Sequence, residues 1–264
     1  SGRRATAAAS FSARATEMNA NAPLPRVSQR LAQASPDFAQ KLSATQALLR
    51  KASQEHAQIK QASSLGAEDV VISHLIAEMG LPIPVFVLDT GALHHQTLAL
   101  LERQQASARW TIEVHRPVQT QVLAWVAQHG QEAITQSVAL RQDCCRVRKI
   151  EPLERALQGQ SAWITGLRRE QSASRAEVRE IDDSEQALRG RVKFNPLANW
   201  LWGDVWHYIA SQQIDYNPLH DDFYPSIGCA PCTRAISLGE PFRAGRWWWE
   251  DDSAKECGLH MKKP

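Results

Sequence analysis

The sequence predicts a single α/β domain with a mostly parallel sheet, followed by an irregular C-terminal tail. Apolar runs of strand length alternate with segments in which apolar residues recur at helical spacing, which is typical of a parallel sheet covered on both faces. Neither an internal repeat nor a Pro/Gly-rich linker interrupts residues 40–226. We therefore expect a disordered N-terminal extension over 1–36, the α/β domain over 37–226 and the tail over 227–264.

The first half of the domain predicts a strand, a turn and a helix in direct succession. Apolar residues at helical spacing fill 37–61, a short strand leads into the turn 63–69, and an amphipathic helix follows over 70–79. Such a turn suits an anion, because free backbone N–H groups at the helix start face the ligand. A single glycine in such a turn more often reflects plain turn chemistry, so the turn alone does not establish phosphate binding.

Strands and helices continue to alternate along the rest of the domain. We expect strands over 84–88, 111–116, 162–167 and at the end of 191–197, and helices over 94–105, 118–129, 139–157 and 199–212. Ligands on such sheets bind outside the carboxyl ends of the strands. The turn 63–69, Asp89 with Thr90, and Arg168 should therefore meet at one edge of the sheet.

The composition of the 264-residue chain argues against several classes of protein. Thirty Lys and Arg nearly balance 28 Asp and Glu, which disfavours a general nucleic-acid or membrane-surface binder. No apolar run approaches the roughly 20 residues of a membrane-spanning helix. Five cysteines are too few for a disulfide scaffold of this length. We expect a cytoplasmic protein, and homo-oligomerisation stays open.

The first residues have the composition of a leader. They are rich in Arg, Ala and Ser, and no acidic residue precedes Glu17, which is typical of an organelle transit peptide. Alternatively, Met18 is the natural start and the residues before it are an added leader. In both cases we expect this segment to take no part in the chemistry.

Four of the five cysteines form two pairs, Cys144 with Cys145 and Cys229 with Cys232. Four thiolates are the usual complement of a [4Fe–4S] cluster, and they also suit structural zinc. Two adjacent cysteines converge poorly on one small ion, whereas the several irons of a cluster relieve the crowding. The spacing thus favours a cluster and leaves zinc open, and a vicinal disulfide is the least favoured interpretation.

The fifth cysteine, Cys257, remains for chemistry. A lone cysteine is ordinarily an inert buried residue. Cys257, however, follows an acidic segment and lies three residues before His260 in the tail. Attack by sulfur requires a thiolate, and cations around a bound anion would lower the pKa of the thiol.

Eight segments resemble, in this order, the assimilatory adenylyl-sulfate (APS) reductases, the iron–sulfur branch of the APS and phosphoadenylyl-sulfate (PAPS) reductase family. They are QASSLGAEDVV, LDTGALHHQT, CCRVRKIEPL, WITGLRREQSASR, KFNPLANW, IGCAPCTR, GRWWWE and ECGLH, and they span residues 62–260 almost completely. The resemblance implies an adenine-nucleotide α-hydrolase-like fold related to the PP-loop ATP pyrophosphatases. The pyrophosphatase turn is richer in Gly and Ser than SSLGAED, which fits a loop that holds a nucleotide without cleaving ATP.

The resemblance also implies an enzyme and a reaction. Thioredoxin, or a glutaredoxin-like donor, reduces adenylyl sulfate to sulfite and AMP in sulfate assimilation. In this reaction Cys257 first attacks the sulfate sulfur and becomes an S-sulfocysteine, with His260 beside it, and the thiol donor then releases sulfite. The four paired cysteines hold a [4Fe–4S] cluster, residues 37–226 bind the nucleotide, and the tail carries cluster ligands and the nucleophile.

Basic side chains should bind the anionic substrate, because catalysis on sulfate and phosphate is largely electrostatic. A single Arg or Lys is ordinarily a solvated surface charge, but Lys149 lies one helical turn after Cys145. The residues expected to bind substrate are Ser63, Ser64, Gly66, Asp89, Thr90, Lys149, Arg168, Arg175, Arg243 and Arg246.

Two alternative functions differ in what they require of the sequence. A PAPS reductase typically lacks the paired cysteines. A non-enzymatic iron–sulfur or zinc binding module would need neither ECGLH nor a nucleotide-binding sheet. Two other motifs receive no site: His94 and His95 point apart on a helix and should not bind metal, and the run of Trp247, Trp248 and Trp249 suits packing better than base stacking.

Overall fold

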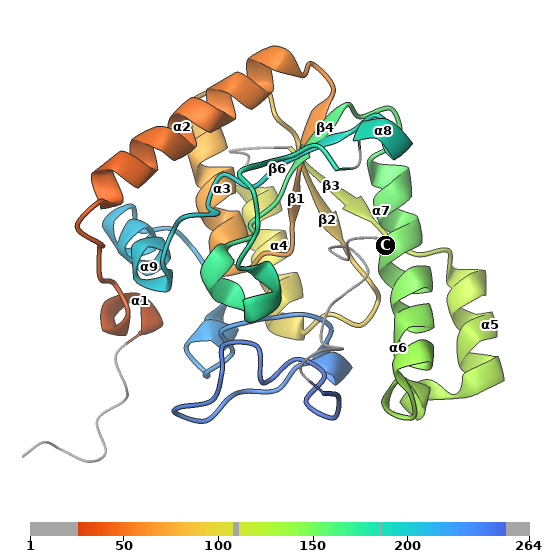
Figure 1. Cartoon of the computed structure of the whole chain (residues 1–264). Helices are drawn as coiled ribbons and strands as arrows, with labels where there is room; N and C mark the ends of the chain where they lie inside the picture. The colour runs from red at the N-terminus through yellow and green to blue at the C-terminus, as the bar shows by residue number, and fades with distance from the viewer. Residues whose placement is uncertain (1–25, 108–110, 185, 252–264) are drawn as a thin grey trace, which may run out of the picture.

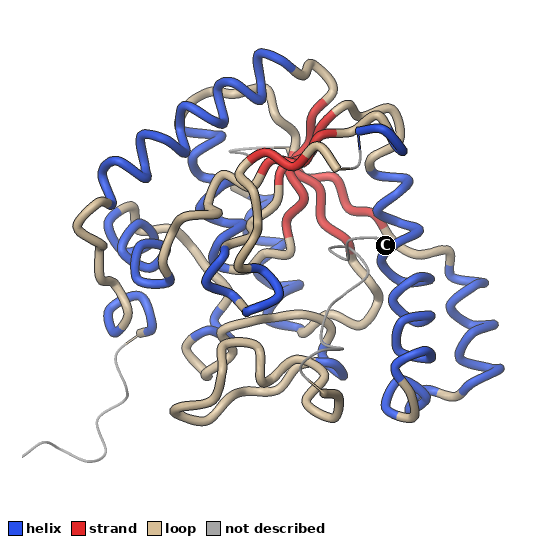
Figure 2. The backbone as a smooth tube through the Cα atoms, in the orientation of Figure 1, coloured by secondary structure: helices blue, strands red, loops and turns tan. Residues whose placement is uncertain are grey.

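The computed structural model describes residues 26–107, 111–184 and 186–251, and one sheet lies at its centre (Figure 1, Figure 2). Its strands follow the order β3-β2-β1-β4-β6-β5. All neighbours pair in parallel except β5 with β6. This confirms the predicted mostly parallel sheet. The strands are β1 (Ile59–Ser63), β2 (Val85–Leu88), β3 (Ile112–His115), β4 (Ala162–Ile164), β5 (Ile181–Asp182) and β6 (Val192–Phe194).

Helices cover both faces of the sheet. Figure 1 shows α2, α3 and α9 on one side and α5, α6 and α7 on the other. The helices of the described residues are α1 (Val27–Arg30), α2 (Phe38–Glu55), α3 (Ala67–Glu78), α4 (His95–Ala106), α5 (Gln119–His129), α6 (Val138–Cys145), α7 (Glu151–Ala156), α8 (Gln186–Arg189) and α9 (Trp202–Ser211). None of them is long and apolar enough to cross a membrane.

Two apolar clusters hold the helices to the sheet. One joins α2, α3, α4 and α9 to strand residues such as Ile59 and Phe194. The other joins α7 to Phe86 and Trp163 on the opposite face. Because side chains alternate between the faces of a strand, strands covered on both faces read as continuous apolar runs.

Helix α3 differs from its prediction as an amphipathic helix. Every residue from Ala67 to Ile76 is buried, because the helix lies between β1 and α9 and contacts both. The first turn also begins three residues earlier than expected, which brings the buried carboxylates Glu68 and Asp69 to the carboxyl end of β1.

The predicted helix 139–157 is interrupted where the paired cysteines end. A π-helical turn, Arg146–Ile150, separates α6 from α7. Such wide turns interrupt the regular α-helical hydrogen bonding and often occur at functional sites. This turn follows Cys145 directly and carries Lys149.

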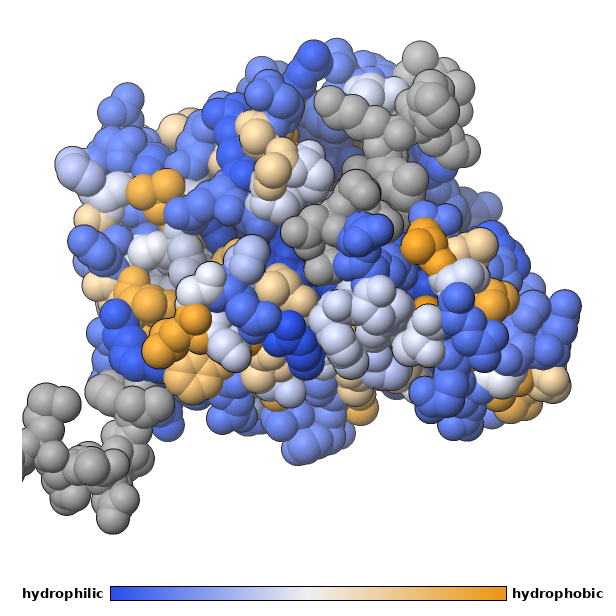
Figure 3. Space-filling model, turned by 60° about the horizontal axis from the view of Figure 1, so that its bottom comes forward, coloured by the Kyte–Doolittle hydropathy of each residue, from blue (hydrophilic) through white to orange (hydrophobic). Residues whose placement is uncertain are grey.

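Both ends of the described chain pack onto the domain. Residues 26–36 belong to the segment predicted as disordered, yet Val27 is buried and its N–H donates to Asp221 Oδ1 at 2.6 Å. In the C-terminal segment, Cys229 forms a β-bridge with Leu93, and Trp247 is fully buried. On the face shown in Figure 3 hydrophilic residues predominate, and hydrophobic ones gather in separate groups.

Candidate active site

A cavity of about 210 Å³ lies at the carboxyl ends of the central strands. The strand order places β2 and β3 on one side of β1 and β4 and β6 on the other. The connections diverge at this point, which is where doubly wound sheets bind ligands. Eight of the residues expected to bind substrate line the cavity: Ser63, Ser64, Gly66, Thr90, Lys149, Arg175, Arg243 and Arg246.

The turn after β1 is shaped by a buried carboxylate. Asp69 accepts hydrogen bonds from the backbone N–H of Ser64 at 2.6 Å and from its hydroxyl at 2.7 Å. Gly166, at the end of β4, must be a glycine because a Cβ there would lie 2.4 Å from Asp69 Oδ1. Burial raises the pKa of Asp69 to about 6, although the bonds from Ser64 oppose the shift. Asp69 thus joins the turn to β4 beneath the cavity.

The raised pKa of Asp69 predicts a pH-dependent stability. Protonated Asp69 is preferred in the folded state, so its stabilising effect is complete below pH 3.8 and lost as the pH rises through about 6. The shift corresponds to about 3 kcal/mol. Asp69→Asn does not titrate, so its unfolding free energy relative to wild type should rise by up to about 3 kcal/mol between pH 4 and pH 7.

Urea unfolding at several pH values measures this difference. The exposed carboxylate of Asp222, replaced in Asp222→Asn, controls for the loss of one surface charge. A wild-type minus Asp69→Asn difference that does not change with pH would contradict the prediction.

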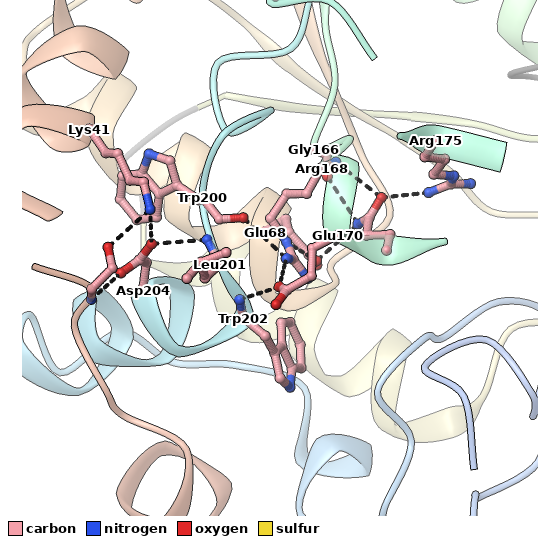
Figure 4. Close-up of polar contacts among 12 residues, drawn as sticks. Lys41, Glu68, Gly166, Arg168, Glu170, Arg175, Trp200, Leu201, Trp202 and Asp204 are labelled. Atoms are coloured by element: carbon pink, nitrogen blue, oxygen red, sulfur yellow. Dashed lines mark hydrogen bonds and ion pairs between the residues drawn. The ribbon is translucent and has the colours of Figure 1, made fainter. Parts of the chain in front are cut away.

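Arg168 lies behind the cavity rather than on its wall, which differs from our expectation. Its guanidinium is fully buried and pairs with Glu68 at 2.9 Å and with Glu170 at 2.7 Å (Figure 4). The strand β4 ends at Ile164, before the predicted end at residue 167, and the following turn directs Arg168 toward Glu68. Arg168 therefore joins the turn after β4 to helix α3.

Asp89 is also absent from the described residues that line the cavity. Its carboxylate accepts hydrogen bonds from Arg116 Nε at 2.9 Å and from the Gly91 N–H at 3.0 Å. These bonds shape the turn after β2, which presents Thr90 to the cavity. The structure thus gives Asp89 a role in the backbone around the site.

The C-terminal segment supplies a cation held by its own backbone. Arg246 is buried, donates to the carbonyl of Ile227 at 3.2 Å and lies over the ring of Trp247 at 4.6 Å. A Cβ on Gly228 would lie 2.3 Å from Arg246 Nη2, so a larger residue there would force the guanidinium to shift. Arg246 is thus fixed at the cavity wall.

The four paired cysteines all line a second cavity, which has a volume of about 300 Å³. Lys149 and Trp247 line both cavities, so the two adjoin. Arg148, which also lines the second cavity, reaches the carbonyl of Thr90 at 2.8 Å. The sequence prediction that the two cysteine pairs meet agrees with this arrangement. Within the described ranges, no three His, Cys, Asp or Glu side chains are arranged to hold a single metal ion.

Burial favours the protonated form of two thiols of this cavity, Cys144 and Cys232. Burial raises the pKa of Cys232 to about 11 and also raises the pKa of Cys144. The charges of Lys149 and Arg148 oppose these shifts. The Thr90 hydroxyl lies 3.2 Å from the sulfur of Cys229. Ligation would require the thiols to lose their protons, and the cations favour that loss.

Cys257 and His260 lie outside the described residues, so their roles stay predictions from the sequence. Within the described part, Glu68, Gln171 and His220 are among the polar residues of the cavity wall that the sequence did not predict as ligands. Glu68 and Gln171 belong to quoted segments but carry no charge pattern that indicates a ligand. Burial lowers the pKa of His220 to about 4, and its Nδ1 donates to the carbonyl of Tyr224 at 2.7 Å.

The comparison with known proteins decides the family. The model of the phosphoadenosine phosphosulfate reductase domain matches residues 58–235. A Burkholderia cepacia adenosine 5′-phosphosulfate reductase is 49% identical over 226 residues, which are 86% of this chain and 90% of that protein. The chain belongs to the phosphoadenosine phosphosulfate reductase family. The resemblance seen in the sequence is thereby confirmed.

Solved structures of this family and of more distant proteins share the fold. A Candida auris phosphoadenylyl-sulfate reductase, in a phosphate complex, superimposes with a TM-score of 0.61 at 25% identity, over 77% of this chain and 98% of its own. A Candida glabrata FMN adenylyltransferase superimposes with a TM-score of 0.55 at 11% identity, over 87% of this chain and 83% of its own. This chain thus shares its architecture with a phosphoadenylyl-sulfate reductase of known structure.

Proposed function

We propose that the chain reduces adenylyl sulfate to sulfite and AMP, with thioredoxin or a glutaredoxin-like protein as the thiol donor. One observation carries the proposal: a cation-lined cavity at the switch point of the sheet adjoins a cavity lined by four thiols. The Burkholderia cepacia relative bears the name of this reductase. Free thiols and a thiol donor suit the reducing cytoplasm, where we place the protein.

The proposed cofactor is a [4Fe–4S] cluster held by Cys144, Cys145, Cys229 and Cys232. The residues present fit it, because four thiols line one cavity and cationic side chains lie beside them. A single zinc ion would need all four sulfurs within about 2.3 Å of one point, which adjacent cysteines reach poorly. When bound, the cluster supplies a charged structural centre beside the substrate and, in this proposal, no electrons.

Substrate binding rests on the chain's own donors. Ser63, Ser64 and Gly66 place the turn after β1 against the nucleotide, at the start of α3. Lys149, Arg175, Arg243 and Arg246 would hold the phosphosulfate, since fixed donors stabilise charge that moves onto a leaving group. Because Lys149 lines both cavities, it would also place a positive charge between the bound anion and the four thiols.

Sulfur transfer would then proceed in two displacements. The thiolate of Cys257 attacks the sulfate sulfur, the bond to the phosphate oxygen breaks, and AMP leaves with that electron pair. His260 is proposed to hydrogen-bond the transferring group. One donor thiolate attacks the Cys257 sulfur and expels sulfite, and the second donor thiol resolves the mixed disulfide. The donor loses two electrons, and Cys257 returns to a thiol.

Sulfite release from the two nucleotides tests the proposal. Anaerobically purified protein with reduced thioredoxin should release sulfite from adenylyl sulfate and far less from its 3′-phosphorylated form. A preference for the phosphorylated nucleotide would support the PAPS reductase alternative. Iron-loaded protein that releases sulfite from neither nucleotide would support the non-enzymatic binding module.

A further inference from the structure

Gln171 occupies a fully bonded position on the wall of the nucleotide cavity. Its side-chain oxygen accepts from Arg175 Nη1 at 2.6 Å and from the Arg168 N–H at 3.1 Å. Its nitrogen donates to Glu68 Oε1 at 2.9 Å and to the carbonyl of Gly166 at 3.2 Å. An amide offers two donors and two acceptor sites, so these bonds fix which end faces Arg175.

The groups that hold this amide are themselves fixed. Glu68 lies in the buried helix α3 and pairs with Arg168 at 2.9 Å. Arg168 also contacts Glu170, whose carboxylate accepts from the N–H of Trp202 at the start of α9 (Figure 4). Gly166 admits no Cβ against Asp69. The amide is thus anchored to α3, to the end of β4 and, through Glu170, to α9.

We propose that Gln171 is a positioning residue that holds the guanidinium of Arg175 at the wall of the nucleotide cavity. The proposal rests on the proposed function, in which Arg175 binds an anionic group of the substrate. An arginine has many rotamers, and a fixed acceptor at 2.6 Å selects one of them. Because an amide carries no net charge, it orients Arg175 without weakening its attraction for an anion.

A double-mutant cycle separates positioning from structural support. Gln171→Met keeps a side chain of similar length but removes the four hydrogen bonds of the amide. Arg175→Ala removes the guanidinium. Both are made in the Cys257→Ser protein, so that adenylyl sulfate binds without sulfur transfer, and its Kd is measured by calorimetry. Gln171→Met should weaken binding about tenfold when Arg175 is present and less than about twofold when it is absent. Equal weakening in both backgrounds would overturn the proposal.

Asn199 offers a matched control in the same region. Its side-chain oxygen accepts from Arg169, the neighbour of Arg168, on the exposed side of the domain. Asn199→Ala removes an amide–arginine bond remote from the cavity and should change the Kd less than about twofold. A thermal melt verifies that Gln171→Met is folded. If it is not, Gln171→Asn, which keeps an amide but shortens its reach, takes its place and should also weaken binding only when Arg175 is present.

A second readout does not depend on substrate. The Nε–H group of Arg175, assigned by its loss in Arg175→Lys, should give a rigid ¹⁵N NMR signal in the unmodified protein and a mobile one in Gln171→Met or Gln171→Asn. An Arg175 signal that stays rigid in a folded Gln171 variant would overturn the proposal. If the Cys257→Ser protein does not bind adenylyl sulfate, the proposed function fails, and the NMR signal still decides the role of Gln171.

Discussion

Anaerobically purified Cys229→Ser protein is expected to lack iron and acid-labile sulfide and to lose more than about 100-fold of its sulfite-releasing activity. Changes that only affect the partners of metal ligands already cost about 10- to 100-fold in typical sites, and this change removes a proposed ligand. The structure strengthens the expectation, because Cys229 is buried and bridges to the turn after β2 through Leu93. Iron and sulfide analysis, together with the visible absorption spectrum, measures the loss.

Pro231→Ala is the matched control for this loss. Pro231 lines the same cavity and lies in the same short turn, Ala230–Cys232, but it carries no thiol. This variant should keep its iron and most of its activity. Wild-type protein that contains zinc and no iron would refute the cluster, and so would a Cys229→Ser protein with its full complement of iron.

The sequence identified the edge of the sheet at which the site forms, for a physical reason. Strands buried on both faces are continuous apolar runs, so the ends of PVFVL and AWITGL mark where polar side chains can first turn toward a ligand. That logic placed the turn 63–69 and Thr90 at one edge of the sheet, and in the structure Ser64 and Thr90 line one cavity there. It depends only on local pattern and on the shared direction of parallel strands.

The direction of individual side chains could not be derived in the same way. Arg168 directly follows residues of this edge, yet it turns inward because Glu68 and Glu170 pair with it. Glu68 lies far from Arg168 in the sequence, and Glu170 lies in a turn that has no regular periodicity. Helix α3 likewise appeared amphipathic because the sequence does not show that α9 covers its second face. Long-range packing decided both outcomes.

The spacing of the cysteines favoured a cluster as the proposed cofactor but left zinc open. Cys144 and Cys145 come from the end of α6, and Cys229 and Cys232 flank a short turn in the C-terminal segment. Nothing local predicts that these segments meet, but a shared metal centre does. The structure brings them to one cavity next to Lys149, which the helical spacing from Cys145 had suggested.

The Cys257→Ser variant is expected to keep its iron and its nucleotide affinity and to lose activity by on the order of 10⁴-fold or more. A serine hydroxyl is far less ionised at neutral pH than a thiol, and only the ionised form attacks sulfur effectively. The proposed cluster ligands are the four paired cysteines and do not include Cys257, so the iron content should match that of the wild type. Serine variants of Cys257 and Cys229 should therefore differ in colour while both fail to release sulfite.

Mass spectrometry locates the proposed intermediate directly. Wild-type protein incubated with adenylyl sulfate and without thioredoxin should gain one SO₃ group on the peptide that carries Cys257, and reduced thioredoxin should remove it as sulfite. If the proposed cluster occupies the four paired cysteines, Cys257 is the remaining cysteine of the sequence. No second thiol would then resolve this adduct, and turnover should stop after one substrate per site. An SO₃ group on another residue, or sulfite release by the Cys257→Ser variant, would show that a different group performs the attack.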